Sequence, residues 1–144
     1  MRWHHAAITV SDMQKSLSFY QDVLGFTLFM DEVVSGPELD KVFMETGVGI
    51  RMVMLTDEAG NMIELIEWQS HLATRRPSQY LKFKSTGLVE ICLSVPDLEK
   101  LMDDLDKKGF KCRVPIWNFE AGGFGTKVTY VEDPDGVQIE LIQI

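Results

Sequence analysis

Two glutamates lie where a solvated carboxylate is unexpected. Glu64 and Glu140 each stand in the middle of a strand-like run of aliphatic residues, GNMIELI (60–66) and GVQIELI (136–142), 76 residues apart. Along such a strand, alternate side chains face opposite sides, so each glutamate projects from the side opposite its flanking isoleucine and leucine. Because burying an unpaired carboxylate is costly, each should meet a cation or take up a proton. Carboxylates held in this way can bind a metal ion or move a proton.

A second repeat adds one candidate residue to each half of the chain. The stretch HAAITVSDMQKSL begins at His5, and EICLSVPDLEKLM begins at Glu90, 85 residues later. Each stretch leads to a Gly-Phe pair, at 25–26 and 109–110, and each half then ends with its IEL glutamate. An internal repeat of this kind changes the expected fold, and it indicates a duplicated module.

The elements that must position these residues follow from periodicity. Two helices are expected, and Ser11 is expected to cap the first. The apolar stripe of the first helix comprises Met13, Leu17, Tyr20 and Leu24, and that of the second comprises Leu98, Leu101, Met102 and Leu105. Strands are expected near 5–10, 27–33, 50–56, 62–68, 90–95, 111–117, 127–132 and 137–143. The insertion 35–47 has a possible helical turn at 37–45, and 119–125 is expected to be a long hairpin connection. The apolar faces of the first strand of each half should pack under the helices, which leaves the faces of His5 and Glu90 for another use.

Several other residues have simpler interpretations. Glu67, on the face opposite Glu64, is expected to be a solvated carboxylate. Five methionines are expected to serve mainly irregular packing, with some near the candidate residues: Met30, Met44, Met52, Met54 and Met62.

Composition limits the classes of function. The 144 residues suit one domain, and a net charge of −8 argues against a nucleic-acid partner. No apolar run is long enough to span a membrane, and the first residues have no signal-peptide core. The two cysteines, Cys92 and Cys112, form neither a disulfide framework nor a metal knuckle, so a cytoplasmic location is expected.

These motifs, in this order, resemble the vicinal oxygen chelate superfamily, which includes glyoxalase I, methylmalonyl-CoA epimerase, extradiol dioxygenases and bleomycin- or fosfomycin-resistance proteins. The resemblance rests on residues 5–26, 63–67, 87–100 and 132–143. It implies an α+β fold of two tandem βαβββ modules that form a cupped mixed sheet with the helices on its convex face. The modules would be 1–68 and 87–144, joined by a linker at 69–86, within one glyoxalase-like domain.

The resemblance also implies a divalent metal site, with ligands from the first and last strand of each module. The corresponding residues are His5, Glu64, Glu90 and Glu140. Glu90 departs from the commonest pattern, which has histidine there, and this makes a two-histidine iron site of the dioxygenase type less favourable. Three carboxylates brought together need a cation, which leaves two alternatives: a metal (Ni, Zn, Mn, Fe or Mg), or an ion pair with a basic residue such as Arg51 or Lys127.

By the same resemblance, the expected activity is metal-assisted proton transfer or isomerisation of a small substrate that offers two adjacent oxygens, with Glu140 or Glu64 as the base. The alternative is a protein that binds and sequesters a small molecule without turnover; a dioxygenase or a fosfomycin-type transferase is less favoured. A homodimer is the expected assembly.

Overall fold

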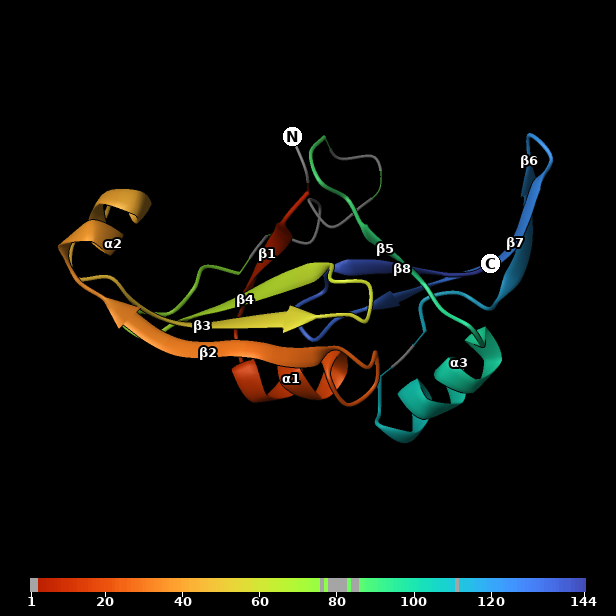
Figure 1. The fold of residues 1–144 in the computed structure, drawn as a ribbon, viewed down its shortest axis with the longest axis horizontal. Coiled ribbons are helices and arrows are strands. Elements are labelled where there is room, and N and C mark those ends of the chain that lie inside the picture. Colours follow the sequence, from red (N-terminus) through yellow and green to blue (C-terminus); the bar gives the residue numbers. More distant parts are fainter. Residues whose placement is uncertain (1–2, 76, 78–82, 84–85, 111) are drawn as a thin grey trace. The chain divides into compact units, whose positions relative to one another are not determined.

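The computed structural model describes residues 3–75, 77, 83, 86–110 and 112–144. The chain divides into two compact units, Met1–Arg75 and Arg76–Ile144. Each unit is built on the same plan, in which a strand and a helix are followed by three further strands (Figure 1). This repeated βαβββ order confirms the predicted α+β fold.

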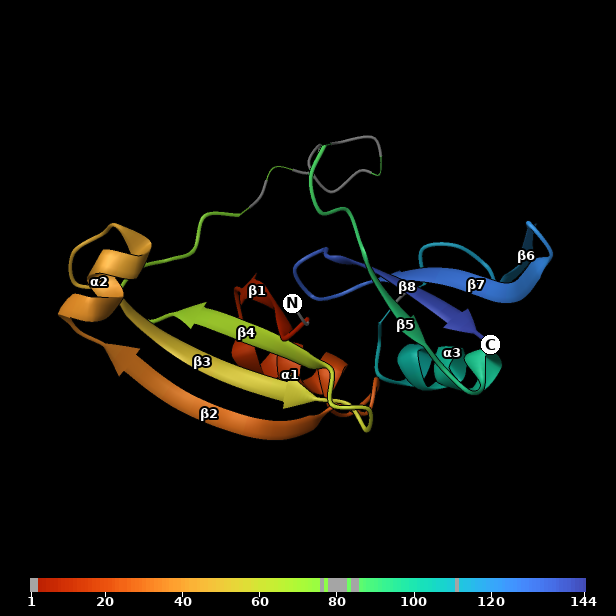
Figure 2. The same ribbon diagram turned by 45° about the horizontal axis from the view of Figure 1, so that its top comes forward.

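In the first unit, a four-stranded mixed sheet has the order β1-β4-β3-β2, with β1 parallel to β4 and the other pairs antiparallel. Its elements are β1 (His5–Val10), α1 (Met13–Tyr20), β2 (Thr27–Ser35), α2 (Pro37–Phe43), β3 (Gly49–Thr56) and β4 (Met62–Trp68). Helix α1 lies beneath one face of this sheet (Figure 2). The helical turn expected in the insertion is confirmed as α2.

The second unit repeats this sheet with the order β5-β8-β7-β6 and with β5 parallel to β8. Its elements are β5 (Ile91–Ser94), α3 (Leu98–Lys107), β6 (Trp117–Ala121), β7 (Phe124–Glu132) and β8 (Gln138–Gln143). None of the helices in the described parts of the chain is long and apolar enough to span a membrane.

Burial confirms the predicted division of strand faces. In β1, Ile8 and Val10 are buried, whereas His5, Ala7 and Thr9 are exposed. The buried faces and the helices together form the core of each unit: Met13, Phe19, Tyr20, Val53, Leu55, Ile63 and Leu65 in the first, and Leu98, Leu105, Val131, Ile139 and Leu141 in the second.

Three local predictions were wrong. Asp12, not Ser11, caps α1, and its carboxylate accepts a hydrogen bond from the Lys15 amide at 3.1 Å. Of the strand expected at 111–117, residue 111 lies outside the described residues, Cys112 forms only an isolated bridge with Val131, and β6 begins at Trp117; Pro115 has no amide hydrogen to contribute to a ladder. The segment 119–125 is not a long connection: β6 and β7 run through it and are joined at Gly122 and Gly123, whose positive φ angles of 58° and 81° suit a two-residue hairpin turn.

Candidate metal and proton-transfer site

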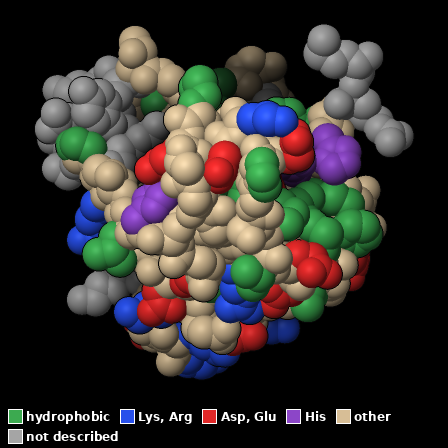
Figure 3. All heavy atoms as spheres, turned by 90° about the vertical axis from the view of Figure 1, so that its left-hand side faces the viewer, with side chains coloured by type: hydrophobic (Ala, Val, Ile, Leu, Met, Phe, Trp, Pro, Cys, Tyr) green, Lys and Arg blue, Asp and Glu red, His purple; other side chains and the backbone are tan. Residues whose placement is uncertain are grey.

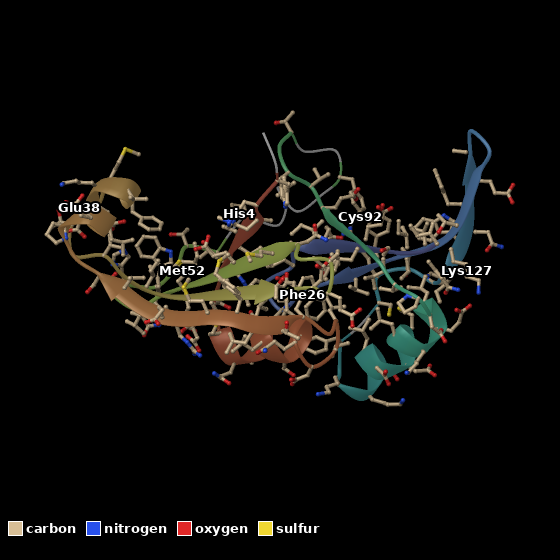
Figure 4. The ribbon with its side chains drawn as sticks, viewed as in Figure 1. His4, Phe26, Glu38, Met52, Cys92 and Lys127 are labelled. Carbon is tan, nitrogen blue, oxygen red and sulfur yellow. The ribbon has the colours of Figure 1, made fainter. Side chains whose placement is uncertain are left out.

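In the first unit, the sheet brings His5 and Glu64 together. Glu64 on β4 pairs directly with Ala7 on β1, so His5, two residues earlier, lies diagonally across from it on the same face. The Nε2 atom of His5 is 3.3 Å from Oε2 of Glu64, and the two side chains are 36% and 13% exposed. Nδ1 of His5 is 2.8 Å from Nδ1 of His4, which precedes β1 (Figure 4). One imidazole nitrogen and one carboxylate therefore meet at a partly exposed point.

In the second unit, Glu140 on β8 lies between Cys92 on β5 and Tyr130 on β7, each of which is its direct cross-strand partner. The Tyr130 hydroxyl donates a hydrogen bond of 2.8 Å to Oε1 of Glu140. The Tyr130 ring is held between Trp117, which stacks on it, and Phe83, which meets it edge-on. The packed ring fixes the direction of the donor, so Glu140 has a defined orientation.

Glu90 belongs to the same group of side chains. It stands immediately before β5, at the position that corresponds to His5 in the repeat. Burial, together with the negative charge of Glu140, raises the pKa of Glu90 above its usual range, while a hydrogen bond with Tyr130 opposes this rise. Glu140 is thus close enough to disfavour the ionisation of Glu90.

The same negative environment keeps its neighbours protonated. Desolvation, followed by the effect of Glu140, raises the pKa of the Cys92 thiol to about 12. Desolvation and the hydrogen bond to Glu140 also raise the pKa of the Tyr130 hydroxyl. The Tyr130 hydroxyl therefore stays protonated and donates its hydrogen bond to Glu140.

The ion-pair alternative has no support from the basic residues that were its candidates. Arg51 binds Asp31, with Nη2 and Oδ2 2.7 Å apart, and Lys127 binds Glu99, with Nζ and Oε1 2.5 Å apart. Within the described residues, no lysine or arginine forms an ion pair with Glu90 or Glu140. The excess negative charge at these carboxylates is the condition that a cation would relieve.

The four expected ligands fall into two pairs, one in each unit. His5 and Glu64 supply nitrogen and oxygen in the first, and Glu90 and Glu140 supply oxygen in the second, a donor set that suits a divalent metal ion. Within the described part of the chain, no three histidine, cysteine, aspartate or glutamate side chains form a metal-binding group. Each pair alone is thus an incomplete ligand set, and the four-ligand site remains a prediction.

Two residues that tie a helix to its sheet were missed or misinterpreted. Glu67 is not a solvated carboxylate: its Oε1 accepts a hydrogen bond of 2.7 Å from the Met13 amide, at the first residue of α1. In the second unit, Oε1 of Gln143 accepts an equivalent bond of 2.8 Å from the Leu98 amide, at the first residue of α3. The signal was present in the sequence, because Glu67 and Gln143 each follow their IEL glutamate by three residues.

Tyr130 was also missed as a partner of the site. It precedes Glu140 by ten residues, just as Met54 precedes Glu64, and each is the direct antiparallel partner of its glutamate. Comparison of the two repeats at this spacing would have identified Tyr130.

A family model described as Glyoxalase/Bleomycin resistance protein/Dioxygenase superfamily matches residues 2–141. The chain belongs to this superfamily. It is 31% identical over 139 residues to a probable lactoylglutathione lyase from Synechocystis sp., covering 96% of this chain and 92% of that protein. It is 30% identical over 144 residues to the mitochondrial methylmalonyl-CoA epimerase of Mus musculus, and the match covers 99% of this chain and 72% of that protein.

Among solved structures, a glyoxalase family protein from Bacillus cereus has the same fold, with a TM-score of 0.87. The two chains are 18% identical, and the match covers 99% of this chain and 93% of that one. At this identity the likeness concerns the fold alone.

Proposed function

We propose that this protein is a divalent-metal-dependent enzyme of the glyoxalase or epimerase type, which moves a proton on the carbon beside a carbonyl. The substrate would be a small molecule with two adjacent oxygens. The observation that supports this most directly is the equivalence of the two pairs: His5 with Glu64, and Glu90 with Glu140, at matching positions of the repeat. The relatives named as a lyase and as epimerases favour the same kind of chemistry.

Four side chains would hold the metal: His5, Glu64, Glu90 and Glu140. When bound, a divalent ion would polarise the substrate carbonyl and stabilise the negative charge that develops on its oxygen. Either Glu64 or Glu140 would accept the proton from the neighbouring carbon and return it, which yields a rearranged or epimerised product. The hydrogen bond from Tyr130 would keep the Glu140 carboxylate in one orientation throughout.

The first test is elemental analysis of the dialysed protein, with Glu140→Ala and an exposed-residue control, Glu58→Ala, prepared in parallel. About one divalent first-row metal ion per chain in the wild type and in the control, and little in Glu140→Ala, would support the site. The enzyme assay would then follow exchange of the α-proton of hydroxycarbonyl and acyl-thioester compounds in deuterated water. Absence of metal from all three proteins after incubation with Mn²⁺, Ni²⁺ and Zn²⁺ would refute a metal-dependent activity.

The second candidate function is sequestration of a small molecule without turnover. It is favoured by the departure of Glu90 from the histidine pattern, because a chain that had lost its metal would not need to keep that ligand. Recovery of a tightly held small molecule, unchanged after prolonged incubation, would decide for this function. The expected homodimer and cytoplasmic location remain predictions.

A further inference from the structure

Four methionines lie on the same face of the first unit's sheet as Glu64. Met54 on β3 is the direct cross-strand partner of Glu64, and Met30 on β2 is the direct partner of Met54. Directly paired residues project to the same side of a sheet, so these three form one row across the strands. Met52 and Met62 project from the same side in the neighbouring rows. We call the four thioether side chains, Met30, Met52, Met54 and Met62, the methionine face.

The methionine face is only partly covered within its own unit. Helix α1 packs against the opposite side of the sheet, where Ile63 and Leu65 are buried. Met54 is 6% exposed, while Met30, Met52 and Met62 are half-buried and so still reach solvent. Met52 projects from β3 in Figure 4. A patch of hydrophobic side chains, bordered by a histidine and by acidic groups, is visible in Figure 3.

The charge of this face is one-sided. Its ionisable side chains are His5, Glu64 and Glu32, which is the direct partner of Met52. Strands β1 to β4 contain no lysine and one arginine, Arg51, which projects from the opposite side and is bound there to Asp31. A substrate portion with phosphates or several carboxylates would therefore meet no lysine or arginine from these strands, and Glu32 would repel it.

We propose that the methionine face binds an uncharged apolar chain or ring of the substrate, next to the oxygens that meet Glu64. Thioethers are flexible and polarisable, so they fit aliphatic chains and aromatic rings of varied shape. The preferred substrate is then a hydrophobic α-hydroxycarbonyl or 1,2-dicarbonyl compound, and not one attached to an anionic peptide or nucleotide. This inference rests on the proposed function for the chelating oxygens, but the binding of the apolar portion can be measured separately.

Hydroxamates test the inference, because they chelate metals through two adjacent oxygens whatever chain they bear. Binding of acetohydroxamate, octanohydroxamate and the anionic succinohydroxamate would be measured by calorimetry with Ni²⁺ present. Octanohydroxamate should bind at least about tenfold more tightly than acetohydroxamate, since each buried methylene adds to affinity. Met52→Gln and Met52→Lys should abolish this preference, and Met52→Lys should improve binding of succinohydroxamate.

Met44→Lys is the matched control, because Met44 is 92% exposed and follows α2 outside the sheet. Circular dichroism would verify that each variant is folded. Equal affinities for the two alkyl hydroxamates, or an equal loss in Met44→Lys, would overturn the inference. So would a change from dimer to monomer in Met52→Lys without any change in ligand preference, since a second copy of the chain would then be the occupant of the face.

A metal-free measurement separates this inference from the proposed function. The uncharged fluorophore N-phenyl-1-naphthylamine should bind the metal-free wild type and Met44→Lys, and should bind Met52→Lys at least about fivefold more weakly. If this holds while no hydroxamate binds in the presence of metal, the methionine face stands and the metal site is refuted. If the fluorophore binds all three proteins alike, the face has no role in binding apolar ligands.

Discussion

Removal of the Glu67 carboxylate should destabilise the protein although Glu67 lies outside every helix. Its Oε1 accepts the Met13 amide at 2.7 Å, and Met13 is 1% exposed, so little water is available to replace the lost acceptor. An unsatisfied buried amide costs about 1–3 kcal/mol, and a negative charge at a helix N-terminus contributes about 0.3–1 kcal/mol. For Glu67→Ala we expect a loss of about 2 kcal/mol in the free energy of unfolding. For Glu67→Gln, which keeps an oxygen acceptor, we expect about 0.5 kcal/mol.

The measurement is urea unfolding followed by circular dichroism. With a denaturant slope of about 2 kcal/mol per molar urea, Glu67→Ala should lower the unfolding midpoint by about 1 M, and Glu67→Gln by about a quarter of that. Gln143→Ala, which removes the equivalent acceptor at the start of α3, should cost about 1 kcal/mol. Glu58→Ala, in an exposed turn, is the control. The reasoning is refuted if Glu67→Ala behaves like the control, or if Glu67→Gln is as unstable as Glu67→Ala.

Three further predictions concern titrating groups. Burial and the charge of Glu140 raise the pKa of Glu90, so Glu90 binds its proton more tightly in the folded protein than in the unfolded chain. The stability of the metal-free protein should therefore fall as pH rises from the unfolded to the folded pKa of Glu90. Metal-free Glu90→Gln should lack this fall and should melt at a higher temperature than the wild type at about pH 7. The Cys92 thiol, with its pKa raised to about 12, should react with iodoacetamide at about pH 8 at least tenfold more slowly than free cysteine, and Glu140→Gln should accelerate the reaction. The hydrogen bond from Arg51 lowers the pKa of Asp31, so the pair stabilises the fold above the ordinary aspartate pKa, and this contribution is lost as pH falls through the lowered pKa. In urea unfolding, Asp31→Asn should lower the free energy of unfolding by up to about 1 kcal/mol at about pH 7 and by almost nothing at about pH 2.

The sequence was sufficient to predict the repeated module and the faces of its strands. Both depend on local periodicity, and the alternation of exposed His5 and Ala7 with buried Ile8 and Val10 is visible in six residues. The error at 111–117 arose because a run with apolar residues was accepted as a strand in spite of Pro115. The two-residue turn at Gly122 and Gly123 was missed because the strand beside it had been predicted too early in the chain.

The candidate site could be predicted only as far as each residue's position on its own strand. Which residue faces Glu140 from the neighbouring strand depends on register, and the pairing with Tyr130 follows from the β7–β8 hairpin and not from any pattern around Glu140 itself. The interaction of Glu67 with α1 likewise joins residues 54 positions apart. Such contacts are found in the sequence only when the two repeats are compared position by position.

That comparison also distinguishes the surroundings of the two site glutamates. Both repeats keep the glutamate, but its cross-strand partner is Met54 in one and Tyr130 in the other. A phenol can donate a hydrogen bond to a carboxylate, whereas a thioether makes no such bond. The Tyr130 hydroxyl therefore holds the Glu140 carboxylate in one orientation. Glu64, whose cross-strand partner is Met54, has His5 as its polar neighbour at 3.3 Å, so it lies where a polar and an apolar part of the same sheet face meet.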